Sequence, residues 1–61
     1  MKLGSVLLCT DSNGHFGLTK GKLYISHTPA NAYNFVYVRV VNDMGKLVNA
    51  LAYRFQLIVS P

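Results

Sequence analysis

The sequence predicts a small all-β domain, a single barrel of five short strands spanning residues 1–61. Five stretches rich in β-branched and aromatic residues alternate with clusters of Gly, Asn, Asp and Pro, which is the pattern of strands and turns. A chain of 61 residues has room for one core. Its residues are 51% hydrophobic and only 13% charged, a composition that favours a folded chain over a disordered one. Closing the strands into a barrel would protect edges that otherwise pair with other chains.

A long loop separates the first two expected strands. Residues 3–10 are mostly apolar and run into a cluster of turn formers. Residues 11–21 then form a connection with three glycines, which supply the positive φ angles that irregular loops need. Residues 22–28 predict the second strand, which ends before Pro29 because proline cannot donate a ladder hydrogen bond.

A hairpin is expected in the second half of the chain. Residues 30–34 are small and polar, which is typical of a loop. Residues 35–41 form the strongest predicted strand, because all of them except Arg39 are aromatic or β-branched. The Asn-Asp-Met-Gly sequence at 42–45 predicts a tight turn, and residues 46–51 are the expected returning strand.

The last part of the chain allows two interpretations. Residues 52–54 predict one short 3₁₀ turn, and residues 55–59 predict a final short strand. The alternative is a helix over residues 47–58, where four apolar residues recur at helical spacing. These four are Leu47, Leu51, Phe55 and Ile58. The helix has no capping residues at either end, which favours the strands.

Three segments of the chain resemble a known family. Residues 17–24 read GLTKGKLY, residues 41–46 read VNDMGK, and residues 53–58 read YRFQLI. They are similar to the LT-x-G-K-x-Y, D-x-G and RF-x-x-V/I patterns of small phage-encoded SH3-like β-barrel proteins. The resemblance implies an SH3-like barrel with a long first loop and a short 3₁₀ turn before the last strand. In such a barrel Leu18 would plug the long loop against the core, and Phe55 would anchor the final strand.

The resemblance leaves one strand face open and suggests a biological setting. The family usually carries an apolar residue two positions after the tyrosine, where this chain has Ser26. The inward face of the second strand is therefore either Tyr24 with Ser26 or Leu23 with Ile25. A phage protein that binds and modulates a host protein is the function that the resemblance implies.

Residues that could carry catalysis or hold a metal are few. The chain has no glutamate, and Asp11 and Asp43 both fall in predicted turns, which argues against acid–base chemistry by a carboxylate pair. Cys9 lies near the end of an apolar strand, where a buried and inert thiol is expected. His15 in a glycine loop and His27 at a strand end are expected on the surface. We therefore expect no enzymatic activity, no cofactor and no metal.

The strand over residues 35–41 is expected to carry a binding surface. Because alternate side chains of a strand point to opposite faces, Val36, Val38 and Val40 would fill the barrel and turn their neighbours outward. An exposed row of Phe, Tyr and Arg has the composition of an interface hot spot. The alternative is that the two faces are reversed. The expected partner-binding residues are Phe35, Tyr37 and Arg39, extended by Tyr33, Tyr53 and Lys22.

The charge of the chain favours an acidic partner. Its formal net charge is +4 and its pI is near 9.6, with Lys and Arg scattered along the sequence. A protein-binding module would dock its aromatic residues and Arg39 on a host protein with an acidic or apolar patch. The alternative is a nucleic-acid-binding barrel, in which exposed aromatics stack on bases and scattered cations hold phosphates. The lack of a Lys/Arg cluster favours the protein partner, and a homodimer is a further possibility.

Two features predict the cellular location. A lone cysteine, Cys9, fits a reducing compartment. No apolar stretch approaches the ~20 residues that a membrane helix needs. We expect a cytoplasmic protein without membrane contact, in the host cytoplasm if the chain is phage-encoded.

Overall fold

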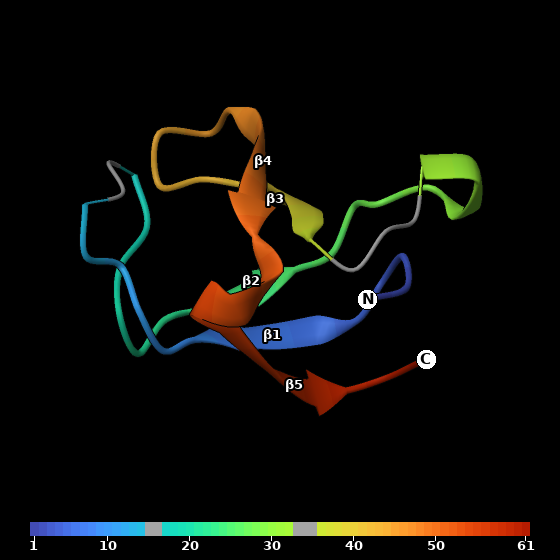
Figure 1. The fold of residues 1–61 in the computed structure, drawn as a ribbon, viewed down its shortest axis with the longest axis horizontal. Coiled ribbons are helices and arrows are strands. Elements are labelled where there is room, and N and C mark those ends of the chain that lie inside the picture. The colour runs from blue at the N-terminus through green and yellow to red at the C-terminus, as the bar shows by residue number, and fades with distance from the viewer. Residues whose placement is uncertain (15–16, 33–35) are drawn as a thin grey trace.

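A computed structural model describes residues 1–14, 17–32 and 36–61 and confirms the all-β class (Figure 1). Over these residues it contains five strands, two 3₁₀ turns and no α-helix. The predictions for His15, Tyr33 and Phe35 lie outside the described residues. The strands are β1 (Val6–Cys9), β2 (Leu23–Ile25), β3 (Tyr37–Val41), β4 (Leu47–Leu51) and β5 (Phe55–Val59), and the 3₁₀ turns are η1 (Ala30–Ala32) and η2 (Ala52–Arg54).

The strands form two antiparallel sheets. The first sheet has the order β2-β1-β5, so β1 is its central strand, and the second is the β3–β4 hairpin. Leu7 lies opposite both Tyr24 of β2 and Leu57 of β5, and the register of β1 against β5 shifts between Val6 and Leu7. Figure 1 shows the hairpin above this sheet in the view, with β4 running at a steep angle to β1.

The expected closed barrel is not found, because the two sheets remain separate. Directly after β2, His27 N donates a backbone hydrogen bond to Arg39 O of the hairpin at 2.7 Å. A second bond runs from Arg39 N to the Thr28 hydroxyl at 2.9 Å. Pro29 follows directly and lacks an N–H, so this contact cannot extend into a ladder. β2 is correspondingly short, at three residues.

The core lies between the two sheets and under the long loop. Leu18 and Phe55 are both 7% exposed and belong to it, as expected. The rings of Tyr24 and Phe55 meet edge to face, with their centroids 5.9 Å apart. The other buried apolar residues are Leu7, Cys9, Val38, Val40 and Ala50. Cys9 is 1% exposed, which confirms the expected burial of its thiol. Because the core is small, polar contacts contribute an important share of the stability.

Most expected elements are present, with shorter ends. The turn at 52–54 and the strand at 55–59 are confirmed, so the alternative helix over 47–58 is wrong. The loop expected at 30–34 contains η1, which the sequence did not predict. Tyr24 and Ser26 face inward, at 5% and 0% exposure, which settles the open face of the second strand. An inward tyrosine is favourable here because its hydroxyl reaches polar partners at the core boundary.

Candidate partner-binding surface

The β3 strand turns its polar and aromatic side chains outward, as the alternation predicts. Val38 and Val40 are 1% and 0% exposed, whereas Tyr37 is 47% exposed on the opposite face. The prediction that Val36 also faces inward is wrong. Val36 precedes β3 and is 56% exposed, and its carbonyl accepts a hydrogen bond from Ala52 N at 2.8 Å. The alternation of buried and exposed side chains therefore begins only at Tyr37, where β3 starts to pair with β4.

The pairing of β3 with β4 extends this surface across the hairpin. Residues directly opposite in an antiparallel ladder share a face, and here Tyr37 pairs with Leu51, Arg39 with Asn49 and Val41 with Leu47. We call these six residues the hairpin face: Tyr37, Arg39, Val41, Leu47, Asn49 and Leu51. The three β4 members were missed from the sequence. The turn at 42–45 was the available signal, because a tight turn sets the register of the two strands.

Arg39 lies at the centre of the hairpin face and is held in place. Its Nε donates to the Asn49 side-chain oxygen at 3.3 Å. Its backbone N–H and carbonyl bond the 27–28 segment, so the strand is also fixed at this position. Over the described residues Arg39 forms no ion pair, and its side chain is half-buried between apolar neighbours. This arrangement presents a fixed guanidinium within an apolar surface.

The other expected surface residues lie elsewhere. Tyr53 is in η2 and is 66% exposed, with the Arg54 guanidinium 5.5 Å from its ring centre. Lys22 is bound to Asp43 in an ion pair of 2.8 Å, away from the hairpin face. Tyr33 and Phe35 lie outside the described residues. Of the six expected residues, the structure places Tyr37 and Arg39 together.

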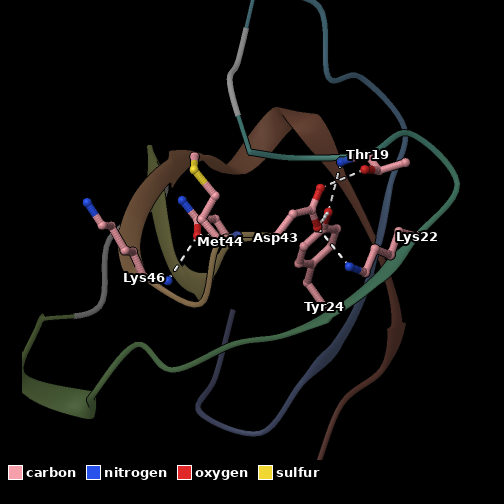
Figure 2. A network of polar contacts seen from close by, with 7 residues as sticks. Thr19, Lys22, Tyr24, Asp43, Met44 and Lys46 are labelled. Carbon is pink, nitrogen blue, oxygen red and sulfur yellow. Dashed lines mark hydrogen bonds and ion pairs between the residues drawn. The ribbon is translucent and has the colours of Figure 1, made fainter.

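A second cluster of polar side chains joins the long loop to the hairpin turn (Figure 2). Asp43 accepts hydrogen bonds from Thr19 Oγ1 at 2.6 Å on one oxygen, and from Lys22 Nζ and Tyr24 OH, both at 2.8 Å, on the other. The Tyr24 hydroxyl in turn accepts from Thr19 N at 2.8 Å. We call Thr19, Lys22, Tyr24 and Asp43 the clasp. It was not predicted, because 24 residues separate Thr19 from Asp43.

Backbone bonds and an asparagine support the clasp. Asp43 N donates to Gly17 O at 2.8 Å, directly tying the loop to the turn. The Asn42 side-chain oxygen accepts from Met44 N at 3.0 Å and Lys46 N at 2.9 Å, which shapes the turn itself. The position of the Asp43 carboxylate is therefore set by the turn that carries it.

The clasp shifts the pKa values of three members. Hydrogen bonds from Lys22, Thr19 and Tyr24 lower the pKa of Asp43 to about 2. The same carboxylate raises the pKa of Lys22 through a hydrogen bond and charge attraction. Burial raises the pKa of the Tyr24 hydroxyl. These directions all favour a neutral tyrosine beside an ionised Asp–Lys pair, which is a stabilising arrangement near neutral pH.

The outer face of the three-stranded sheet is also apolar. Val6 lies opposite Ile25 and Val59, and Leu8 lies opposite Leu23. Leu23, Ile25 and Val59 are 57%, 44% and 54% exposed. Gln56, opposite Leu8, is the polar member of this face. The sequence did not predict this apolar face, because it left undecided which side of the second strand points inward.

Comparison of the chain with protein-family models, curated proteins and solved structures finds no match. Over the described residues, no group of His, Cys, Asp and Glu side chains is arranged to hold a metal ion. The same part of the chain contains no helix with the length and apolar character to cross a membrane.

Proposed function

We propose that this chain is a non-catalytic binding module that docks a protein partner on its hairpin face. The observation that carries the proposal is the composition of that face. Tyr37, Arg39 and apolar residues of two paired strands lie side by side on a rigid support, with Val38 and Val40 buried behind them. Tyrosine and arginine among apolar residues are the side chains enriched at the energetic centres of protein interfaces.

An SH3-like barrel is the fold that we propose for the whole chain. The strand order β5-β1-β2 followed by the β3–β4 hairpin supports it, as do the hydrogen bonds from residues 27–28 to Arg39. The long loop before β2 and the 3₁₀ turn before β5 agree with the same fold. The resemblance described above adds the proposal of a phage protein that binds and modulates a host protein in the host cytoplasm.

Binding by this mode requires no chemistry from the module. The partner would lose activity, or gain a neighbour, because its surface is covered. Aromatic and aliphatic contacts would supply the affinity, and the net charge of +4 would attract an acidic surface. A fixed hairpin loses little conformational entropy on binding, which favours affinity.

The test is affinity capture from a bacterial host lysate with immobilised protein, at two salt concentrations and with or without nuclease. A Tyr37→Ala/Arg39→Ala variant is compared with the wild type. A Leu23→Ala/Ile25→Ala variant serves as the control, because it removes exposed side chains from the other sheet. Circular dichroism establishes that each variant is folded. We expect one discrete protein that survives nuclease and is reduced about tenfold or more by the first variant alone.

Two results would contradict the proposal. Recovery of nucleic acid alone, or of proteins lost after nuclease and salt, would identify the barrel as a nucleic-acid-binding module instead. Unfolding of the Tyr37→Ala/Arg39→Ala variant would show that these side chains support the fold rather than a partner.

A further inference from the structure

The acidic side chains of the chain are already used internally. The full sequence has two of them, Asp11 and Asp43. Asp43 is bound to Lys22 in the clasp, and Arg54 Nη1 lies 3.8 Å from the Asp11 carboxylate. Four of the six cationic side chains therefore have no acidic side chain of their own to pair with. This imbalance gives the surface a charge that only another molecule can complement.

Arg39 differs from the other three of these cations in its surroundings. Lys2, Lys20 and Lys46 lie in loops and turns and are exposed to solvent. Arg39 is half-buried in the middle of a strand, with Tyr37 and Val41 beside it on the same face. The residue as a whole is half-buried, while its bond to Asn49 is exposed. A charge beside apolar side chains interacts more strongly with an opposite charge than one fully surrounded by water. Arg39 is thus the cation best placed to discriminate between partners.

The orientation of the guanidinium adds geometric selectivity. Its Nε is engaged by the Asn49 side-chain oxygen at 3.3 Å, an interaction that limits rotation of the side chain. The two Nη groups form the remaining pair of donors, and their parallel N–H bonds match the two oxygens of a carboxylate. Asn49 contributes an oxygen without charge, so it orients Arg39 and does not neutralise it.

Resting on the proposed function, we infer that the hairpin face binds an extended protein segment in which one Asp or Glu is flanked by apolar residues. The carboxylate lies on the Arg39 guanidinium, and the apolar neighbours rest on Val41, Leu47 and Leu51. Asn49 is the positioning residue for Arg39. A single cation within aliphatic surroundings fits one carboxylate better than a polyphosphate backbone, which needs several cations in a row.

The experiment selects peptides from a library of random 12-residue peptides displayed on a carrier, using the immobilised wild-type chain. One enriched peptide is then synthesised, and its affinity is measured by fluorescence anisotropy. We expect enriched peptides to contain one Asp or Glu between apolar residues. Replacing that residue by Asn or Gln is expected to weaken binding about tenfold or more.

Variants of the chain separate the roles of charge and geometry. Arg39→Gln is expected to weaken peptide binding about tenfold or more, whereas Lys46→Gln, with the same loss of charge at the turn, changes it less than about threefold. Arg39→Lys keeps the charge but loses the paired donors, so its loss of peptide affinity should lie between those of Arg39→Gln and Lys46→Gln. Asn49→Asp places a carboxylate of the chain itself beside Arg39, so it should weaken peptide binding as much as Arg39→Gln does. Adding Arg39→Gln to Asn49→Asp should then change the peptide affinity very little.

The outcomes distinguish this inference from the function on which it rests. Enriched peptides without an acidic residue that still lose binding with Tyr37→Ala would overturn the carboxylate site and leave the binding module standing. Equal effects of Arg39→Gln and Lys46→Gln would also overturn it, since they would show general charge attraction. A folded wild-type chain that enriches no peptide would overturn the extended-segment inference, and the capture experiment above would decide separately whether the binding module stands.

Discussion

The clasp and the hairpin face belong to the same β3–β4 hairpin, yet they use charge in opposite ways. At the turn, the Asp43 carboxylate accepts three hydrogen bonds, all from side chains of its own chain. On the strands, Arg39 uses one nitrogen to bond Asn49 and forms no ion pair over the described residues. The Asp43 charge is therefore paired within the fold, whereas the Arg39 charge has no acidic partner among the described residues.

If the proposed function is correct, this difference assigns stability to one part of the hairpin and partner binding to another. The clasp ties residues of the long loop to the turn, so its loss should loosen the packing of Leu18 as well. The hairpin face rests on the buried valines and contributes less to the core. Variants of the two regions should therefore affect different measurements, and three predictions test the contrast.

The largest expected effect is on stability and follows from Asp43→Ala. The change removes the acceptor of three hydrogen bonds and leaves the Lys22 charge without its partner. We expect a clear fall in the denaturant midpoint, measured by far-ultraviolet circular dichroism. Asp43→Asn keeps one acceptor oxygen and should lose less.

The matched comparison for this prediction is Arg39→Ala. Over the part of the chain that the structure describes, the Arg39 side chain makes one hydrogen bond, which is exposed. Its loss should therefore change the free energy of unfolding by less than about 1 kcal/mol. Equal destabilisation by Asp43→Ala and Arg39→Ala would remove the distinction between the two regions.

A smaller loss of stability is expected from Gly17→Ala. Gly17 lies where the long loop meets the turn, and its carbonyl accepts a hydrogen bond from Asp43 N. Gly17 has a φ of +96°, and a Cβ there would lie 3.0 Å from the Asn42 side-chain nitrogen. Backbone strain and this contact together should cost about 2 kcal/mol. Gly45→Ala is the control, because Gly45 has a φ of +79° with no atom near the added Cβ, and should cost about 1 kcal/mol. Equal losses in thermal denaturation would show that Asn42 moves aside without cost.

The smallest expected effect is the pH dependence of the clasp, because the Asp43–Lys22 pair is accessible to solvent and therefore screened. The folded chain lowers the pKa of Asp43 from 3.8 to about 2. Its contribution is therefore complete above pH 3.8 and is lost as the pH falls toward 2. The raised pKa values of Lys22 and Tyr24 add stability that is complete below pH 10 and lost as the pH rises further.

Denaturant midpoints measured across the pH range should show both transitions. Asp43→Asn has no carboxylate at this position, so it should flatten the acid transition. The alkaline fall should remain in that variant, because burial is the main cause of the Tyr24 shift. An acid transition of unchanged size in Asp43→Asn would assign it to another group.

Local patterns predicted the hairpin well, because its signals lie within a few residues of one another. The alternation along residues 35–41, with valines assigned to the inward face, predicted the outward placement of Tyr37 and Arg39, and the turn at 42–45 predicted the hairpin itself. The final strand was predicted with its observed ends. The predicted barrel closure was not found. The length of β2 and its contact with β3 depend on the path of the chain around Pro29, which local patterns do not indicate.

Contacts between distant segments could not be predicted in the same way. Nothing in the spacing of Thr19 and Asp43 indicates that they meet, because their distance depends on how the loop crosses the turn. Tyr24 takes part in the clasp through its hydroxyl, which lies at the boundary of the core. This role depends on the tyrosine pointing inward, which the sequence did not decide. Lys22 shows the same limit, since an exposed lysine in the sequence is bound to Asp43 in the fold.

The central position of β1 has a consequence for biosynthesis. One of its two neighbours, β5, begins 46 residues after β1 ends, so the apolar Val6–Cys9 segment leaves the ribosome long before that neighbour exists. Pairing across such a sequence separation is slow compared with hairpin formation. During translation the β5-facing edge of this apolar strand therefore has no partner, and this interval is when the nascent chain is most open to chaperones and to aggregation.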